Sequence, residues 1–317
     1  MMYYLARLIS FLFCVYGFVF YPADANAGID TVKIETVTSL LATPSYQIDL
    51  ARTKLTIDSL VDPRIDVEKG LKRINRIVRS VKQIAGAGAT SDQQVAAIRT
   101  YLYRSGPWNN NKTFSYNLDD PLGHYIPSKL LPNYLNSHSG NCVSMPFLFI
   151  AIADRMGLNV TASTAPHHVF VKYTNAAGKV INLETTSGAS PSRNAWIRQN
   201  MPMTDIAIKT GAYLKTLSKH ETIVVMAMVL IEHAMEEGRY GTVLNLVKVL
   251  APYYPNFADL YVSQGAAAYK ILETQFYSKY PRPVDIPTSK QGYFRHLNEM
   301  NQRAFAKAEA LGWRPES

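Results

Sequence analysis

Residues 139–157 of the chain read SGNCVSMPFLFIAIADRMG, and this stretch decides the fold. Small and polar residues open it, and a long apolar run follows, up to a closing glycine. Asn141 is a favourable helix N-cap, and Pro146 lies in the first turn, where proline is tolerated. The stretch therefore predicts a buried helix over Asn141–Met156 that carries Cys142 at its beginning.

Three short segments rich in β-branched and aromatic residues follow this helix and predict strands. They are Asn159–Ser163, His168–Tyr173 and Val180–Leu183. The sequence NAAG at residues 175–178 is a turn signal, so the second and third strands should pair as a hairpin. A helix followed by antiparallel strands indicates an α+β fold and not a doubly wound sheet.

Helical periodicity also precedes the opening stretch. Helices are expected from about Tyr46 to Val61, over Val67–Ile84, and after a cap at Ser91. The helical periodicity ends at residues 106–139, where the composition shifts to turn-forming residues: prolines, glycines and the run Asn109–Asn111. A long irregular region inside a compact domain is often functional.

The C-terminal part is almost purely helical. A linker is expected over residues 191–217 and a helical domain over 218–317, with a last helix at about Tyr293–Leu311. Gly238 and Tyr240 at an inter-helix turn, with Pro255 some fifteen residues later, resemble a tetratricopeptide repeat. A plain helical bundle is the alternative interpretation of this region.

The N-terminus resembles a secretory signal. Residues 1–27 combine Arg7, an uncharged apolar core and the small-residue site Ala25–Ala27, which predicts cleavage after Ala27 and a periplasmic or secreted protein. An uncleaved anchor is the alternative. Cleavage would remove Cys14 and leave one cysteine, and an extended lead-in is expected over residues 28–45.

Composition excludes some partners. The net charge of +9 comes from 33 basic and 24 acidic residues spread along the chain, without a basic run or a nucleic-acid-binding motif. A solvated basic surface, with at most a weak attraction to acidic envelope surfaces, fits this better than nucleic-acid binding. The apolar fraction of 47% suffices for ordinary cores.

The predicted helix start gives Cys142 a chemical setting. Unpaired amides and the helix dipole there favour the thiolate and can bind an oxyanion. His168 begins a strand and Glu184 ends the next one, so hairpin pairing makes them cross-strand neighbours. These residues can form a nucleophile, a base and an orienting acid. Each residue also has an ordinary structural interpretation when taken alone. Cys142 can be a buried, unreactive thiol, His168 an ordinary histidine of a strand, and Glu184 an acidic residue facing a turn.

These motifs resemble the transglutaminase-like (papain-like) superfamily, whose members show G-x-C at a helix start, an H-x-W/F-V-x-V strand and a strand ending in D-P-T. The matching segments are Gly140–Cys142, His168–Tyr173 and Leu183–Thr186. The chain looks closest to a bacterial branch with C-terminal tetratricopeptide-like helices. The segments that resemble this branch are Gly106–Asn109, Leu183–Gly188 and Gly211–Leu214.

The resemblance implies a transglutaminase-like domain with an antiparallel sheet over residues 46–190. It implies Cys142 as nucleophile, His168 as base and Glu184 as acid, with Glu in place of the commoner Asp. Trp108 and Tyr116 are the candidates for an aromatic oxyanion group. His167 should point to the opposite face of the strand.

The implied activity is cysteine acyl transfer on an amide bond of a protein or peptide, as a peptidase or amidase, with no cofactor. A non-catalytic envelope module that binds a partner on its helical domain is the alternative. A metal site of Cys142, His167 and His168 lacks a fourth ligand with zinc spacing, and no acidic run has calcium-loop spacing.

Overall fold

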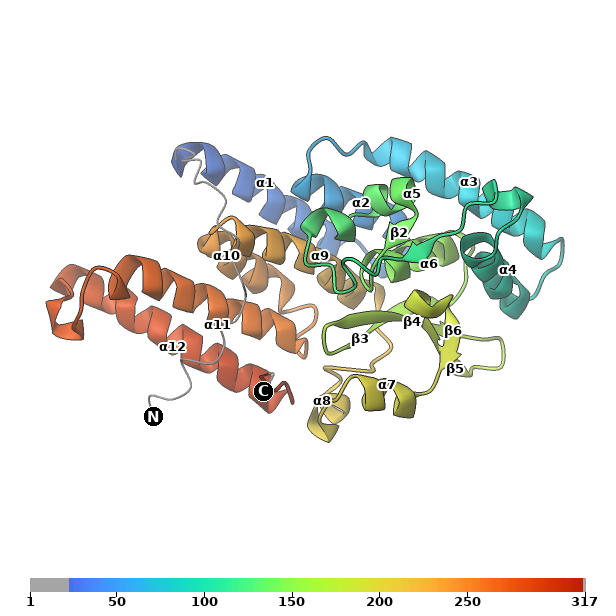
Figure 1. Cartoon of the computed structure of the whole chain (residues 1–317). Helices are drawn as coiled ribbons and strands as arrows, with labels where there is room; N and C mark the ends of the chain where they lie inside the picture. Colours follow the sequence, from blue (N-terminus) through green and yellow to red (C-terminus); the bar gives the residue numbers. More distant parts are fainter. Residues whose placement is uncertain (1–22, 316–317) are drawn as a thin grey trace.

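The structure is a computed structural model that describes residues 23–315 (Figure 1). Residues 1–22, most of the predicted signal peptide including Cys14, lie outside the described residues. The predicted cleavage site falls on the first turns of helix α1 (Ala23–Ala42). Among residues 23–315, no helix is both long and apolar enough to cross a membrane.

The expected extended lead-in over residues 28–45 is wrong, because α1 covers most of it. Val37 and Leu41 are fully buried, and α1 packs on α10 (Tyr240–Leu250), α9 (Lys219–Glu236) and α2 (Leu50–Val61). Asp30 also pairs with Arg239 and accepts a hydrogen bond from Thr242. Threonines and valines give this segment little intrinsic helix propensity, so its helical state depends on tertiary packing, which the sequence pattern does not reveal.

Three capped helices follow. They are α2 (Leu50–Val61), α3 (Val67–Ala85) and α4 (Ser91–Tyr103), and they confirm the helices expected here. The cap of α4 is Thr90 and not Ser91, because Thr90 and Gln93 form a reciprocal capping box. The 3₁₀ turn η1 (Ser45–Gln47) precedes α2.

The region expected to be irregular contains short elements. They are η2 (Pro107–Asn109), β1 (Ser115–Tyr116), η3 (Ile126–Lys129), α5 (Leu131–Ser137) and β2 (Ser139–Gly140). Strands β1 and β2 pair in parallel, with Tyr116 opposite Gly140. This pairing brings residues 115–117 beside the segment that leads into Cys142.

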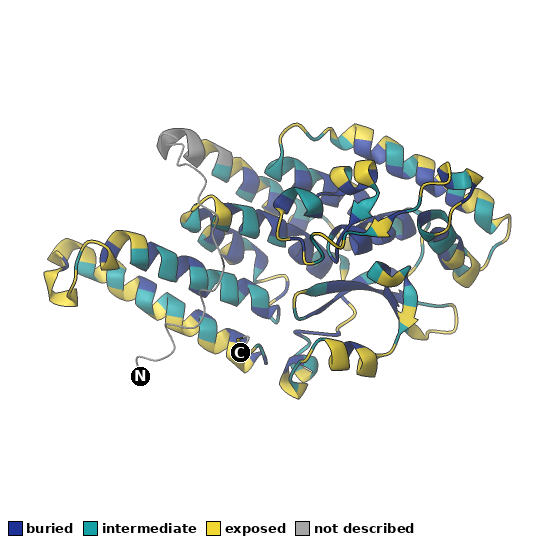
Figure 2. Cartoon of the chain, in the orientation of Figure 1, coloured by how far each residue is buried: buried dark blue, intermediate teal, exposed yellow. Residues whose placement is uncertain are grey.

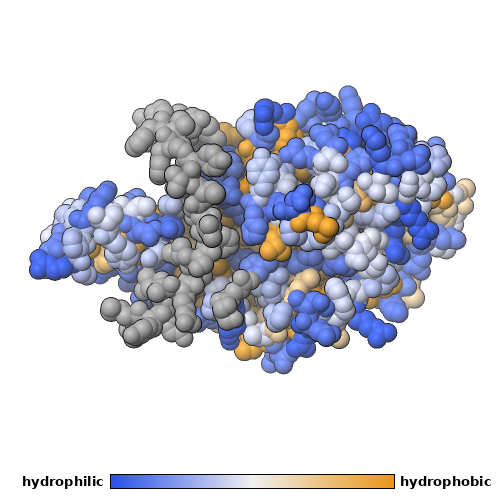
Figure 3. All heavy atoms as spheres, in the orientation of Figure 1, coloured by the Kyte–Doolittle hydropathy of each residue, from blue (hydrophilic) through white to orange (hydrophobic). Residues whose placement is uncertain are grey.

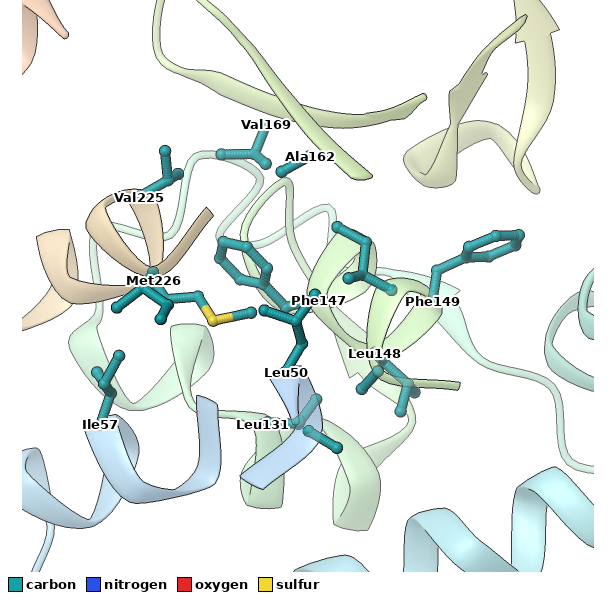
Figure 4. Close-up of a cluster of buried hydrophobic side chains, with 14 of the residues drawn as sticks. Leu50, Ile57, Leu131, Phe147, Leu148, Phe149, Ala162, Val169, Val225 and Met226 are labelled. Carbon is teal, nitrogen blue, oxygen red and sulfur yellow. The ribbon is translucent and has the colours of Figure 1, made fainter. Parts of the chain in front are cut away.

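Helix α6 (Ser144–Arg155) forms the centre of the molecule. Every residue from Ser144 to Ala153 is buried, and α6 contacts α2, α3 and strands β3 (Val160–Ala165) and β4 (His168–Thr174). Figure 4 shows Phe147 of α6 beside Leu50 of α2 and Met226 of α9. A helix that is apolar all round is stable only when it is covered on every side.

A four-stranded antiparallel sheet lies next to α6. Its order is β3 (Val160–Ala165), β4 (His168–Thr174), β5 (Val180–Glu184) and β6 (Ser190–Ser192). The predicted hairpin of the second and third strands is confirmed. A two-residue turn, Pro166-His167, joins β3 to β4.

The remaining elements are η4 (Thr185–Ser187), α7 (Asn194–Asn200), α8 (Asp205–Thr210), α9 (Lys219–Glu236), α10 (Tyr240–Leu250), α11 (Ala258–Leu272), a π-turn η5 (Glu273–Tyr277), η6 (Pro283–Asp285) and α12 (Thr288–Ala310). Consecutive helices from α9 to α12 pack on one another, and the last helix starts five residues earlier than expected. Figure 2 shows exposed residues gathered at the far ends of α11 and α12.

The hydrophobic core crosses the expected boundary at residue 218. Helix α9 packs on α2 and β3, and one buried cluster runs from α1 to α11. The expected linker contains α7 and α8. Its last residues also bond to β3, since the N–H groups of Leu214 and Leu217 donate to the carbonyls of Thr164 and Ala162.

Candidate active site

Cys142 lies at the beginning of the helical turn that leads into α6. The Asn141 side chain accepts hydrogen bonds from the N–H groups of Val143 and Ser144 at 3.0 and 3.1 Å. The first helical bond runs from the Met145 N–H to the Asn141 carbonyl at 3.1 Å. Asn141 therefore caps the turn before α6, but the helix itself begins at Ser144 with Val143 as its N-cap residue, which is later than predicted.

The cap changes the expectation that the first-turn amides bind an oxyanion. Asn141 occupies the N–H groups of Val143 and Ser144. Among the described residues, no hydrogen bond engages the Cys142 N–H. The amide of the cysteine itself is thus the backbone donor that is left for a developing oxyanion.

His168 and Glu184 lie together on one face of the β4–β5 hairpin. The register pairs Val171 with Leu183, which places His168 diagonally across from Glu184. The His168 Nε2 and Glu184 Oε2 atoms are 2.7 Å apart, a hydrogen-bond distance. The Cys142 side chain lies near enough to the His168 ring to raise its pKa, and because Nε2 faces Glu184, Nδ1 is the ring nitrogen that remains for the thiol.

The Glu184 carboxylate is fixed from its other side. Its Oε1 atom accepts hydrogen bonds from the N–H and the hydroxyl of Thr186, at 3.1 and 2.7 Å. Burial acts to raise the pKa of Glu184, but the hydrogen bond and charge of His168, with the two bonds from Thr186, lower it overall. Glu184 is therefore ionised at neutral pH.

The charge state of His168 follows from the same contacts. Burial acts to lower the pKa of His168, and the hydrogen bonds to Cys142 and Glu184 overcome it and raise the pKa to about 9. An imidazolium beside a thiol stabilises the thiolate form. The three side chains are thus arranged as a nucleophile, a base and an orienting carboxylate.

His167 is not on a strand, which corrects the expectation that it points to the opposite face of β4. It is the second residue of the two-residue turn and has a φ of +53°. Proline followed by a residue with positive φ is the pattern of a type II turn. The His167 carbonyl accepts from the Cys142 thiol at a Sγ···O distance of 3.6 Å.

The two oxyanion candidates have different positions. Tyr116 is opposite Gly140 in the β1–β2 pair. Burial raises the pKa of Tyr116, and the charges of Cys142 and Glu184 raise it further. The Trp108 indole N–H instead donates to the Arg104 carbonyl, and its ring covers Gly106.

The structure therefore brings only Tyr116 of the pair up to the segment preceding Cys142. Trp108 lies in the same long loop as Tyr116 but does not reach this segment. The Trp108 indole N–H anchors the loop at η2 through its bond to the Arg104 carbonyl, just after α4. The ring therefore packs at the end of α4.

Sequence reasoning missed a polar link behind the nucleophile. The Asn141 Nδ2 donates to the Ser128 hydroxyl at 2.8 Å, and that hydroxyl donates to Asp120 at 2.5 Å. Asp120 also accepts from the N–H of His124 at 2.6 Å. Asp-Pro and Gly in this loop signalled a turn, but no local pattern signals its pairing with Asn141.

In the described part of the chain, no group of three or more His, Cys, Asp or Glu side chains is arranged to hold a metal ion. No curated protein matches the chain. A family model described as the transglutaminase-like superfamily matches residues 68–226, from the start of α3 into α9. Because the matched segment is half of the 317 residues, this chain belongs to the transglutaminase-like superfamily.

Proposed function

We propose that the protein is a cysteine acyl-transfer enzyme that hydrolyses an amide bond, with Cys142, His168 and Glu184 as its triad. The observation that carries this proposal is the chain of contacts from the thiol through the His168 ring to Glu184, with a His168–Glu184 distance of 2.7 Å. Membership of the superfamily supports the same class of chemistry.

The reaction follows from the geometry in two halves. The Cys142 thiolate attacks the amide carbonyl carbon and forms a C–S bond, while the Cys142 N–H stabilises the oxyanion. The His168 imidazolium gives its Nδ1 proton to the leaving amine as the C–N bond breaks. Neutral His168 then takes a proton from water, which attacks the thioester, so that the C–S bond breaks and the thiolate returns.

Glu184 acts through His168 in this scheme. Its carboxylate holds the Nε2–H, so Nδ1 is the nitrogen that exchanges protons with the substrate. Thr186 fixes the carboxylate in turn. Glu184→Gln keeps the shape of this contact but removes the charge, so we expect it to slow the reaction less than His168→Ala does.

The thiol provides the direct test. We expect iodoacetamide to alkylate Cys142 rapidly near pH 7, and His168→Ala to slow both alkylation and amide hydrolysis, by roughly 10²–10⁴-fold for the hydrolysis. Cys142→Ala should abolish hydrolysis. His296→Ala, at an exposed histidine of α12, is the matched control and should change neither rate. Equal alkylation of the wild type and His168→Ala would contradict the proposal.

Export is part of the proposal. The sequence of residues 1–27 supports cleavage after Ala27 and a periplasmic or secreted location. Mass spectrometry of the protein purified from its native host tests this location. A soluble cytoplasmic form that retains Met1 would contradict it.

The alternative function, a module that binds a partner, is supported by the C-terminal helices. Helices α10, α11 and α12 enclose a groove of about 340 Å³, lined by apolar and polar side chains that include Leu244, Lys248, Tyr261 and Met300. Tetratricopeptide-like packing of α9 and α10 would fit this role. Two variants separate the two functions. If Cys142→Ala abolishes hydrolysis, and the change of Leu244 and Met300 to Ser leaves hydrolysis unchanged, the result favours the enzyme over the binding module.

A further inference from the structure

The loop beside the nucleophile presents large apolar side chains to solvent. Leu118, Leu122 and Tyr125 are 80%, 49% and 68% exposed, and all three lie within eight residues. We propose that they form a docking surface for a large apolar side chain of the acyl donor, next to the amide that Cys142 attacks. This inference rests on the proposed function and adds the substrate class.

The loop is attached directly to the nucleophile segment. The Asn117 N–H donates to the Gly140 carbonyl at 2.6 Å, which extends the β1–β2 pairing to the start of the loop. At the other end, the Asn141 side chain donates to Ser128 at 2.8 Å. Residues 118–125 are therefore held on both sides by the residues that precede Cys142.

Hydrogen bonds inside the loop fix its conformation. The carboxylate of Asp120 accepts from the N–H groups of His124 and Tyr125 and from the Ser128 hydroxyl. The Tyr116 hydroxyl donates to the Pro121 carbonyl at 3.2 Å. These bonds use the polar groups inside the loop and leave its apolar side chains pointing outward. Such preorganisation lowers the entropic cost of binding.

Close packing also holds the middle of the loop in place. Gly123 has a φ of +69°, and a Cβ there would lie 2.6 Å from the Asn141 amide nitrogen. Only glycine fits both restrictions. The loop is thus pressed against the residue that caps the nucleophile helix, while Leu122 on one side and Tyr125 on the other stay exposed.

Exposed apolar side chains elsewhere include Val32 on α1 and Trp196 on α7, and single residues of this kind are ordinary. The exposed Tyr277 and Tyr293 pack on Phe294 and Phe276, within an aromatic cluster of their own. On the face drawn in Figure 3, hydrophobic residues also reach the surface near the centre of the molecule. The carboxylate of Asp120 is already hydrogen-bonded within the loop, so it does not offer a charge to a polar or basic ligand. The ligand that suits this surface is therefore an apolar side chain.

The test compares two sets of serine substitutions in the whole chain. The loop variant changes Leu118, Leu122 and Tyr125, and because all three are exposed, it should fold as the wild type does. The control variant changes Tyr46 and Val284, which are 84% and 76% exposed on η1 and η6. Circular dichroism and the unfolding midpoint check that both variants are folded.

Three electrophiles then report on the site, with labelling of Cys142 followed by mass spectrometry. Two are dipeptidyl vinyl sulfones with Phe or Glu next to the electrophile, and the third is iodoacetamide, which needs no docking. We expect the Phe probe to react roughly tenfold faster than the Glu probe in the wild type and in the control variant. The loop variant should lose this preference and keep its rate with iodoacetamide.

The outcomes separate the two proposals. If iodoacetamide labels Cys142 rapidly but the Phe probe has no advantage, or keeps it in the loop variant, the docking surface is refuted and the enzyme proposal stands. If the loop substitutions change only binding to phosphatidylcholine–phosphatidylglycerol vesicles or self-association, the surface serves a lipid or a second copy. A Cys142 that is inert to all three reagents refutes the proposed function and the docking surface together.

Discussion

His168 is held between two partners in a nearly closed environment. Its side chain is 9% exposed, with Glu184 on one ring nitrogen and the Cys142 thiol on the other. Burial alone would favour the neutral ring, so the positive charge of His168 exists because of these two contacts. The stability of the folded state is therefore linked to this proton.

The linkage gives a pH prediction. The folded-state pKa of His168 is about 9, above the ordinary 6.5. Its contribution to the free energy of unfolding is full below pH 6.5, declines as the pH rises, and is lost above pH 9. The shift corresponds to about 3 kcal/mol. Guanidinium unfolding at several pH values between 6 and 9.5 should show this decline in the wild type.

His168→Gln is the variant that isolates the effect, because glutamine keeps hydrogen-bonding groups without a titrating charge. Other groups also titrate in this range, so the quantity to compare is the difference between the wild type and His168→Gln at each pH. A difference that does not shrink from pH 6 to pH 9.5 would show that His168 is neutral in the folded protein.

At the scale of single elements, Asn141 serves both the helix and the loop. Its oxygen caps the turn at Cys142, and its amide nitrogen holds Ser128. Asn141→Ala should lower the free energy of unfolding by about 1–2 kcal/mol through the lost cap. It should also slow the alkylation of Cys142, because the cysteine loses its fixed position.

Thr90→Ala is the matched control for this prediction. It removes the capping box at the start of α4 and should cost a similar free energy of unfolding. Its alkylation rate should equal that of the wild type. If both variants slow alkylation equally, the effect of Asn141 is general destabilisation and not positioning.

A second element-scale prediction concerns α2. Lys54 and Asp58 form an ion pair with both side chains fully buried, and Asp58 also accepts from the Leu131 N–H at 2.7 Å. Asp58→Ala leaves a buried ammonium and an unpaired N–H, so it should lower the free energy of unfolding by about 3–5 kcal/mol. Urea unfolding measures this change.

Lys54→Met should cost less than Asp58→Ala. Burial raises the pKa of Asp58, so the carboxyl can take a proton when its partner is removed. Glu299→Ala, in an exposed pair with Arg303, is the surface control and should change stability by less than about 0.5 kcal/mol. Equal losses for Lys54→Met and Asp58→Ala would contradict this account of the pair.

Much of the site could be predicted because its signals are local. Asn141 indicates the start of a helical turn, runs of β-branched residues indicate strands, and the turn at residues 175–178 determines which strands pair. These together place His168 near Glu184. The position of Trp108, the link from Asn141 to Ser128 and the helical state of α1 depend on contacts between distant segments, which leave no periodic trace in the sequence.

At the scale of the whole molecule, the sheet and the C-terminal helices share one core. Helix α9 buries Ile223, Met226 and Leu230 against the elements that precede it, and α2 is its main neighbour. The family match ends inside α9, which agrees with a hydrophobic core that includes α9 together with the preceding elements. The geometry of the candidate site therefore depends on residues far beyond the strands that carry it.

Truncation tests this dependence. A chain that ends at residue 217 exposes the apolar surface that α9 covers, so we expect it to lack a cooperative unfolding transition. A chain that ends at Phe257 keeps α9 and α10 and should unfold cooperatively. Circular dichroism with urea distinguishes the two, and cooperative unfolding of the shorter chain would show that the first 217 residues fold alone.

The late position of α9 also sets the timing of folding during synthesis. Its first residues reach back to the beginning of the described chain, since Lys219 donates to the Ile48 carbonyl at 2.7 Å and His220 meets that of Thr43 at 2.9 Å. At about 5–20 residues per second, translation from the end of α6 to the end of α9 takes roughly 4–16 seconds. Throughout that interval, the surfaces of α2 and β3 against which α9 packs have no partner to bury them.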